Sequence, residues 1–244
     1  MRLHILGCGD AFGSGGRQQS AYLVEASDRL FLLDCGPTAL LAMKHAGFDP
    51  RLLDAIILSH LHGDHFGGVP FFYLDDLYRK PRHKPLIIAG PPGTEERIRE
   101  LYRVMYGSGP TPADNSLHVF QVLRPDELQN VAAVAVFPFR VPHQTHDVSL
   151  GLKVEYQGKQ ILFSGDSAWT ELFIDQARGV DLFLCECSFY SEEPGMHINY
   201  QALRANLPRL ECRRVVVTHL GEEMLARKDE LSVTVAEDGL VIEI

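Results

Sequence analysis

Residues 59–65 read Ser59-His60-Leu61-His62-Gly63-Asp64-His65 and follow directly on the apolar run Ala55-Ile56-Ile57-Leu58. Three imidazoles and one carboxylate fall within six residues, at His60, His62, Asp64 and His65. A strand that leads into such a loop presents polar side chains at the edge of a sheet, the usual place for a site in α/β proteins. Imidazole and carboxylate groups suit zinc and related divalent metals. The segment therefore predicts a metal site on an α/β scaffold.

The same loop can supply ligands to two metal ions. His60 and His62 alternate, so in extended backbone their side chains point the same way. Gly63 permits a sharp turn, after which Asp64 and His65 can converge on a second point nearby. A closed structural zinc site would use cysteines more often, and an ordinary solvent-exposed loop would not hold ligands at this density.

Two metal sites need more ligands than one loop provides, and three other expected strand ends offer them. His143, Asp166 and His219 each follow an apolar run that reads as a strand. Taken singly, each of these residues could cap a loop or form an ordinary turn. Because together they complete the ligand set, we expect all three to gather around the His60 loop.

The composition is that of an ordinary globular protein. The 244 residues are 45% hydrophobic and 23% charged, so a sizeable core can form without a metal. No linker or low-complexity segment divides the chain, and we expect one domain over residues 1–244. No signal-peptide pattern or membrane-length apolar stretch is present. The five cysteines lack CxxC spacing, which indicates free thiols and a cytoplasmic location.

The net charge of −9 disfavours a broad nucleic-acid surface, because such surfaces are usually basic. Two local basic clusters remain: Arg79-Lys80-Pro81-Arg82-His83-Lys84, and the set Arg204, Arg209, Arg213 and Arg214. Either cluster could guide a phosphate group, but such runs more often form a solvated charged face.

Strand and helix signals alternate along the chain. We expect helices at 38–46, after an N-cap at Thr94, and at 200–207. Strands are expected at 3–6, 21–25, 30–33, 55–58, 85–89, 131–141, 150–156, 160–163, 182–185 and 214–217, followed by a hairpin of 232–235 and 240–244. A tight turn is expected at 157–159 and a loop at 106–116. This order predicts an α/β fold of two sheets with outer helices.

These motifs resemble those of the metallo-β-lactamase fold superfamily. The matching parts are the segment 59–65, a later histidine, Ser164-Gly165-Asp166 and Thr218-His219. The resemblance implies a four-layer αββα sandwich with two divalent metals, expected to be zinc with manganese or iron as alternatives, at one edge of the sheets. It implies that His60, His62 and His143 bind one metal, that Asp64, His65 and His219 bind the other, and that Asp166 bridges them.

Within this superfamily the chain is most similar to ribonuclease Z and related phosphodiesterases. Leu33-Asp34-Cys35-Gly36 and Gly90-Pro91-Pro92-Gly93 match that branch, and Asp34 is implied to orient the ligands. Looser matches around Glu186 and His197 imply that His197 protonates the leaving oxygen and that Glu186 orients it; a surface loop histidine is the alternative. Members of this branch are often dimers, so a homodimer is expected by analogy.

Two departures from the branch bear on function. Ribonuclease Z carries a long arm that grips transfer RNA, and only the tight turn at 157–159 stands in its place. With the acidic net charge, this argues against extended nucleic-acid binding. The spacing after the third motif makes His146 a rival to His143, which we favour because it directly follows its strand.

The working hypothesis is metal-assisted hydrolysis of a small-molecule or nucleotide phosphodiester. A water shared by two metals has a pKa of about 7, and Asp64 and Asp166 would orient it while His197 acts as the proton donor. Hydrolysis of a thioester, lactone or other acyl substrate is the first alternative, and a metal-bound binding protein without turnover is the second. An oxygen-reducing di-iron centre is disfavoured, because that branch usually has Glu at the position of His62.

Overall fold

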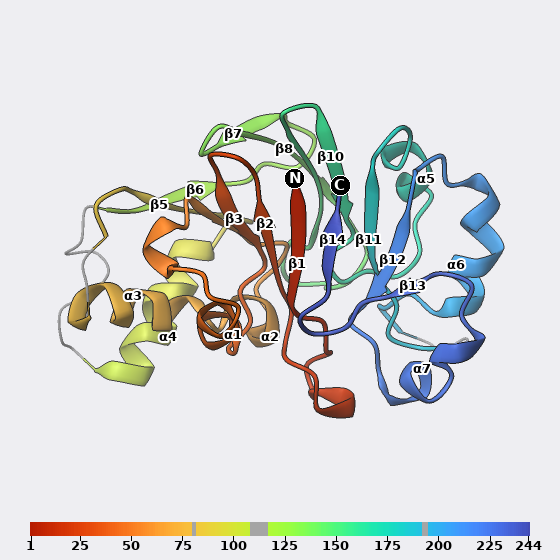
Figure 1. The fold of residues 1–244 in the computed structure, drawn as a ribbon, viewed down its shortest axis with the longest axis horizontal. Helices are drawn as coiled ribbons and strands as arrows, with labels where there is room; N and C mark the ends of the chain where they lie inside the picture. The colour runs from red at the N-terminus through yellow and green to blue at the C-terminus, as the bar shows by residue number, and fades with distance from the viewer. Residues whose placement is uncertain (80–81, 108–116, 192–194) are drawn as a thin grey trace.

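The computed structural model describes residues 1–79, 82–107, 117–191 and 195–244, in which two β-sheets lie face to face between two groups of helices (Figure 1). The first sheet has the order β14-β1-β2-β3-β4-β5-β6. Its strands are β1 (Arg2–Gly7), β2 (Ala21–Glu25), β3 (Leu30–Leu33), β4 (Ala55–Ile57), β5 (Leu86–Gly90), β6 (His118–Val122) and β14 (Val241–Glu243). The neighbours from β3 to β6 are parallel.

The second sheet has the order β13-β12-β11-β10-β9-β8-β7. Its strands are β7 (Gln129–Val131), β8 (Val134–Arg140), β9 (Leu150–Tyr156), β10 (Lys159–Phe163), β11 (Leu182–Glu186), β12 (Val215–Thr218) and β13 (Thr234–Val235). The neighbours from β10 to β13 are parallel, whereas β9 is antiparallel to both β8 and β10. The tight turn expected at 157–159 joins β9 to β10, with Gln157 and Gly158 both at positive φ.

The helices cover the outer faces of the two sheets (Figure 1). The first sheet is covered by α1 (Ala39–His45), α2 (Gly63–Phe66), α3 (Val69–Tyr78) and α4 (Thr94–Tyr106). The second sheet is covered by α5 (Leu172–Gln176), α6 (Tyr200–Asn206) and α7 (Glu222–Ala226). Short 3₁₀ turns include η1 (Ser14–Gly16), which lies beside α7 at the lower edge of the view.

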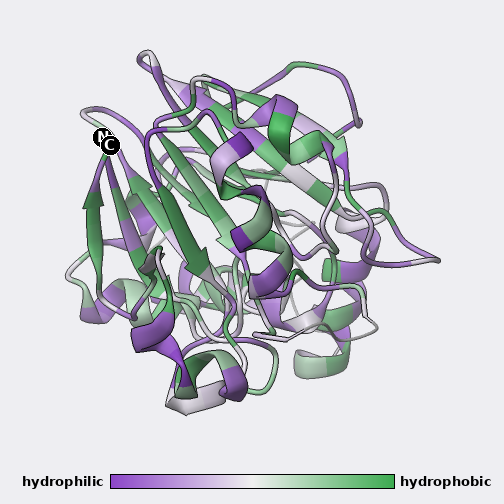
Figure 2. Cartoon of the chain, turned by 90° about the vertical axis from the view of Figure 1, so that its right-hand side faces the viewer, coloured by the Kyte–Doolittle hydropathy of each residue, from purple (hydrophilic) through white to green (hydrophobic). Residues whose placement is uncertain are grey.

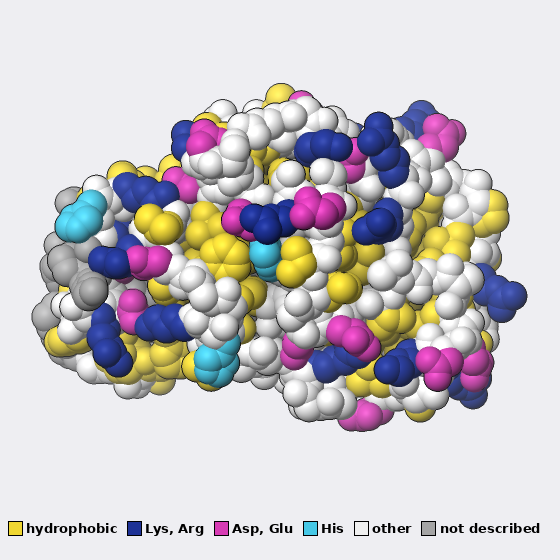
Figure 3. All heavy atoms as spheres, in the orientation of Figure 1, with side chains coloured by type: hydrophobic (Ala, Val, Ile, Leu, Met, Phe, Trp, Pro, Cys, Tyr) yellow, Lys and Arg dark blue, Asp and Glu magenta, His cyan; other side chains and the backbone are white. Residues whose placement is uncertain are grey.

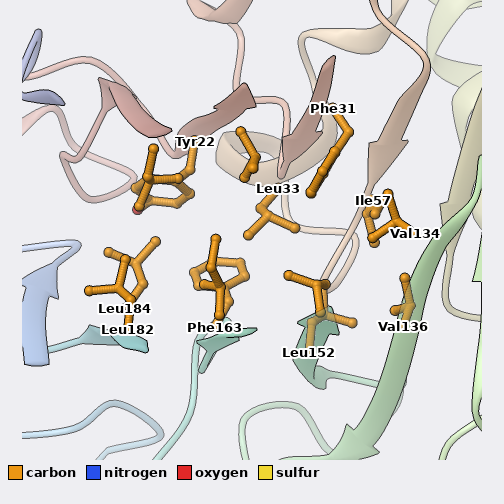
Figure 4. Packing of buried hydrophobic residues seen from close by; sticks show 14 of the residues in the cluster. Tyr22, Phe31, Leu33, Ile57, Val134, Val136, Leu152, Phe163, Leu182 and Leu184 are labelled. Atoms are coloured by element: carbon orange, nitrogen blue, oxygen red, sulfur yellow. The ribbon is translucent and has the colours of Figure 1, made fainter. Parts of the chain in front are cut away.

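Three apolar clusters hold these layers together. The central one lies between the sheets, and Figure 4 shows side chains of the first sheet facing those of the second: Tyr22, Leu33 and Ile57 against Phe163, Leu152 and Leu184. Intervening residues of the same strands, such as Leu23 and Leu32, face the outer helices. A third cluster joins the second sheet to α5, α6 and α7. The αββα sandwich implied by the family resemblance is therefore confirmed.

The strand expected at 131–141 is present as β8 but begins only at Val134, because residue 131 ends a separate strand, β7, that forms a hairpin with β8. Ala132 and Ala133 form its turn at φ of 50° and 70°. Left-handed backbone is rare for alanine, and neither turn position is Gly, Asn or Pro. The one local sign is Asn130, whose Oδ1 accepts a hydrogen bond from Ala133 N at 2.9 Å.

The prediction of a C-terminal hairpin formed by residues 232–235 and 240–244 is wrong. β13 pairs in parallel with β12 in the second sheet, whereas β14 pairs antiparallel with β1 in the first. The connection crosses between the sheets, and the Asp238 carboxylate anchors it by accepting hydrogen bonds from Cys8 N and Gln18 N. Each of the two segments does contain a strand, but the sequence of a strand does not identify its partner.

Other local expectations also differ. β6 was not foreseen, and the N-cap of α4 is Gly93 at a φ of 88°, while the Thr94 hydroxyl donates to Pro91 O. Most of the expected loop at 106–116 lies outside the described residues. Within the first basic cluster, Arg82 is neither solvated nor free for a phosphate, because it is buried in an ion pair with Asp76 at 2.6 Å.

The polarity of the chain follows the layers. Strands are largely hydrophobic, and the helices alternate between hydrophobic and hydrophilic residues (Figure 2). Acidic and basic side chains intermingle over the face seen in Figure 3. Among the described residues, no helix has the length and apolar character required to span a bilayer.

Candidate metal centre

The side chains predicted to bind metal meet at one edge of the sandwich, where strands of both sheets end. β4 leads into the His60 loop, and β10 and β12 lead to Asp166 and His219. β8 and β10 both run antiparallel to β9, so they point the same way, and His143 after β8 reaches this edge too. The carboxyl ends of parallel strands are where α/β sites form.

The first ligand cluster consists of His60, His62, His143 and Asp166, whose ligand atoms all lie within 4.8 Å of one another. His143 Nε2 is 3.1 Å from His62 Nδ1 and 3.8 Å from Asp166 Oδ2. His146 does not belong to the cluster and is exposed. Of the two rivals, the structure brings His143 to the site.

The second cluster consists of Asp64, His65, Asp166 and His219. His65 Nε2 and His219 Nε2 lie 3.2 and 3.3 Å from Asp64 Oδ2, and 3.3 and 3.5 Å from Asp166 Oδ2. Asp166 Oδ2 thus borders both clusters. His219 has a φ of +57°, a conformation that costs energy in a non-glycine residue and that is often found at functional sites.

Hydrogen bonds orient the two histidines that contact Asp34 or its partner Ser59. His65 Nδ1 donates to Asp34 Oδ2 at 2.7 Å. Ser59 Oγ also donates to Asp34 Oδ2, at 2.7 Å, and so accepts from His60 Nδ1 at 3.0 Å. Both rings therefore turn an Nε2 lone pair toward the clusters, the arrangement that a carboxylate behind a histidine ligand produces.

Residues from the second half of the chain orient the rings of His143 and His219. His143 Nδ1 donates to Met196 O at 3.0 Å. Ser188 Oγ donates to Glu186 Oε2 at 3.1 Å and lies 3.0 Å from His219 Nδ1, from which it accepts. Here too the Nε2 atoms are left for the clusters.

Two ring nitrogens within the clusters have no hydrogen-bond partner in the part of the chain that the structure describes. His60 Nε2 and His65 Nε2 are buried, and neither has a hydrogen-bond partner among the described residues. Buried polar atoms are nearly always paired, so such atoms mark a place for an ion or a water. Six nitrogen and carboxylate ligands around a shared carboxylate fit two divalent metal ions.

The pKa shifts of the ligands fall into two groups. Burial acts to lower the pKa of His65 and of His219, but the charge of Asp166 outweighs it and raises both, so a metal ion there would displace a proton. Burial lowers the pKa of His60 and of His143, so both rings are neutral at pH 7 and can bind a metal. Burial alone would raise the pKa of Asp166, but the charges of His219 and His65 hold it well below the usual range. Asp166 is therefore ionised, as a metal ligand must be.

His197 and Glu186 lie together beside the clusters. His197 Nδ1 is 2.9 Å from Glu186 Oε1, and Glu186 is almost fully buried. Burial acts to lower the pKa of His197, but the hydrogen bond and the charge of Glu186 outweigh it and raise this pKa to about 9. The ring is therefore protonated at pH 7 in the metal-free protein. Its hydrogen bond to Glu186 holds it at the site, which argues against the alternative that His197 is an ordinary surface loop histidine.

A cavity of about 500 Å³ opens onto the centre and is lined by side chains from both halves of the chain, including His62, Asp64, Asp166 and His197. Asp10, Phe12 and Ser188 also line it, although sequence analysis gave them no role. For Ser188 the sequence did contain a sign of this position. It comes two residues after Glu186, a spacing that puts both side chains on one face of an extended segment.

Comparisons with known proteins agree with the fold. The chain is 29% identical over 252 residues to the uncharacterized protein Rv1339 of Mycobacterium tuberculosis, covering 99% of this chain and 88% of that protein. It is 27% identical over 301 residues to ribonuclease Z of Methanosarcina acetivorans, covering 100% and 98%. The crystal structure of the metallo-β-lactamase fold protein YhfI from Bacillus subtilis superposes with a TM-score of 0.79 at 22% identity, covering 99% of each chain.

The sequence model of one family, described as anti-Pycsar protein Apyc1, matches residues 1–239. That match spans nearly the whole chain and includes every member of both ligand clusters. The protein is therefore a metal-dependent hydrolase with the metallo-β-lactamase fold, and it belongs to the anti-Pycsar protein Apyc1 family.

Proposed function

We propose that the protein hydrolyses a small phosphodiester of the nucleotide type with the help of two zinc ions. One observation carries this proposal: His197, held by the buried Glu186, lines the same cavity as the two ligand clusters. An alkoxide is a poor leaving group and needs a proton as it departs. A thiolate leaves more readily, so a fixed proton donor favours a phosphodiester over a thioester.

The residues of the two ligand clusters would bind the metal ions. His60, His62 and His143 would hold one ion, Asp64, His65 and His219 the other, and Asp166 both. Two such ions supply Lewis-acid charge to the phosphoryl oxygens and acidify a water to a pKa of about 7. The Asp64 carboxylate accepts a hydrogen bond from the attacking water and orients it.

Proton transfer completes the reaction. As the water oxygen bonds to phosphorus, the bond between phosphorus and the leaving oxygen breaks. The leaving oxygen takes up the proton of His197. Glu186 keeps that ring in position and stabilises its charge. The water's own proton passes to solvent, and a second proton from solvent restores His197.

The size and charge of the protein support a small substrate. A cavity of about 500 Å³ suits a ligand of mononucleotide size. The chain carries a net charge of −9, and a two-residue turn joins β9 to β10 where ribonuclease Z has its arm. We therefore propose that extended nucleic acid is not bound.

The test compares two variants of the zinc-loaded protein on bis(p-nitrophenyl) phosphate and on a thioester. Asp166→Ala should lose metal and activity together. His197→Ala should keep its zinc while kcat on the phosphodiester falls by about 10²–10⁴-fold. His45→Ala, which removes an exposed histidine on α1, is the matched control and should change neither quantity.

The outcomes separate the candidate functions. Thioester turnover without phosphodiester turnover would establish the acyl-hydrolase alternative. Full zinc occupancy with no turnover of either substrate would indicate a binding protein. Equal loss of zinc from both active-site variants would overturn the role given to His197.

A further inference from the structure

Phe12 is unusual among the residues that line the cavity, because its side chain is 91% exposed. Single exposed apolar side chains are common on protein surfaces. Phe12, however, borders the cavity that opens onto the ligand clusters. It belongs to none of the three apolar clusters formed by the described residues. Its position calls for a role in contact with substrate.

The loop that carries Phe12 is firmly held. Asp10 Oδ1 accepts hydrogen bonds from Phe12 N at 3.1 Å and Ser14 N at 2.9 Å, and Asp10 Oδ2 accepts from Ser14 Oγ at 2.6 Å. η1 continues the loop and is tied to α7, because Gly15 N donates to Glu222 Oε1 at 3.0 Å. A side chain on a main chain that is already ordered loses little entropy when a ligand binds to it.

A second aromatic side chain lines the same cavity. Phe189 follows β11, and its backbone is bound to the start of α6 by the hydrogen bond from Tyr200 N to Phe189 O at 2.8 Å. Its ring centroid lies 6.2 Å from that of His197, at an interplanar angle of 71°. Phe189 therefore borders the side of the cavity where the leaving group would be protonated.

Acidic side chains complete this end of the cavity. Asp10, Glu222 and Glu223 line it, and no Lys or Arg does so among the described residues. The carboxylates disfavour a second phosphate group near the phenyl rings. A neutral planar ring that carries N–H donors can pack against the phenyl rings and donate hydrogen bonds to these carboxylates.

We propose that Phe12 and Phe189 bind the base of a substrate that has one phosphate group, and that Phe12 provides a stacking face at the mouth of the cavity. This inference rests on the proposed function, because it places the phosphodiester at the ligand clusters. Stacking between a base and an aromatic side chain is tolerant of base identity, since every base has a π-face. Phe12 thus favours nucleotides over other phosphate esters without selecting one base.

The test measures binding to the zinc-loaded protein by calorimetry with two ligands, a nucleoside 5′-monophosphate and ribose 5-phosphate, which lacks the base. Phe12→Ala should weaken binding of the nucleotide by about 10- to 100-fold, the effect of losing one stacked base. Binding of ribose 5-phosphate should not change. Phe12→Tyr should restore nucleotide binding. Val104→Ala, which removes a 76% exposed side chain on α4, serves as the control and should bind both ligands normally.

Each remaining result counts against the inference. Nucleotide binding that is unchanged in Phe12→Ala, or weakened equally for both ligands, shows that Phe12 does not contact the base. A wild-type protein that binds the two ligands equally shows that no base site exists. Since calorimetry requires no turnover, absence of phosphodiester hydrolysis would refute the proposed function separately.

Discussion

Asn in place of Asp34 tests how the histidine ligands are oriented. Asp34 is fully buried and accepts three hydrogen bonds of 2.7 Å, from Ser59 N, Ser59 Oγ and His65 Nδ1. Its φ of +57° is tolerated by Asn, so the substitution preserves the backbone. With Asn Oδ1 accepting from Ser59 N, the new amide N–H would face the Nδ1–H of His65. His65 then either loses this hydrogen bond or moves its proton to Nε2, the atom that faces the cluster.

The expected effect is a 10- to 100-fold loss of metal affinity, about 1.4–2.7 kcal/mol, as found when a partner behind a histidine ligand is altered. The loss begins at the cluster of Asp64, His65 and His219. It extends to the other cluster through Ser59, whose Oγ lies 3.0 Å from His60 Nδ1.

Zinc affinity is measured by competition with a chromophoric chelator. Asp181→Asn is the matched control, because Asp181 also accepts a backbone hydrogen bond, from Gln160 N, but precedes β11 at the end opposite the site. That variant should bind zinc as the wild type does. If Asp34→Asn binds two zinc ions with unchanged affinity, the orientation argument is wrong.

Three further predictions concern stability. Chelation of the metals should lower Tm by roughly 5–10 °C per site in a thermal scan, because occupancy at 100 times Kd contributes about 2.7 kcal/mol; an unchanged Tm would mean that no metal was bound to the folded state. Gly68→Ala places a Cβ 2.1 Å from the backbone oxygen of Gly36 and should lower the free energy of unfolding in urea by about 3 kcal/mol or more. The Cβ of Gly63→Ala meets nothing within 4 Å, so equal urea midpoints for the two variants would contradict this packing. Arg82→Met leaves the buried Asp76 carboxylate without its guanidinium and should cost about 3–5 kcal/mol by the same assay; a loss below about 1 kcal/mol would show that the pair is not buried in solution.

The sequence made the metal centre predictable because much of it is local. Four side chains of the two ligand clusters come from residues 60–65, and their spacing in one short loop follows from backbone geometry alone. His143, Asp166 and His219 were found because strand ends in an α/β fold converge at one edge.

Errors arose where a local pattern admits more than one partner. The strand signals of β13 and β14 are the same for a hairpin as for two strands in different sheets. The turn between β7 and β8 uses two alanines in a conformation that residue preferences disfavour. Arg82 reads as a surface charge, although Asp76 and two backbone carbonyls surround it.

By itself, the sequence indicated two sheets with outer helices, the ligand types and a metal pair, because apolar periodicity and closely spaced ligands are properties of neighbouring residues. The layering of the αββα sandwich came from the family resemblance. Only the tertiary structure decided that His143 rather than His146 reaches the site and that Ser188 orients His219. It also placed Phe12 and Phe189 on one cavity. Those results depend on segments that lie far apart in the sequence, whose contacts become favourable only after both sheets have packed together.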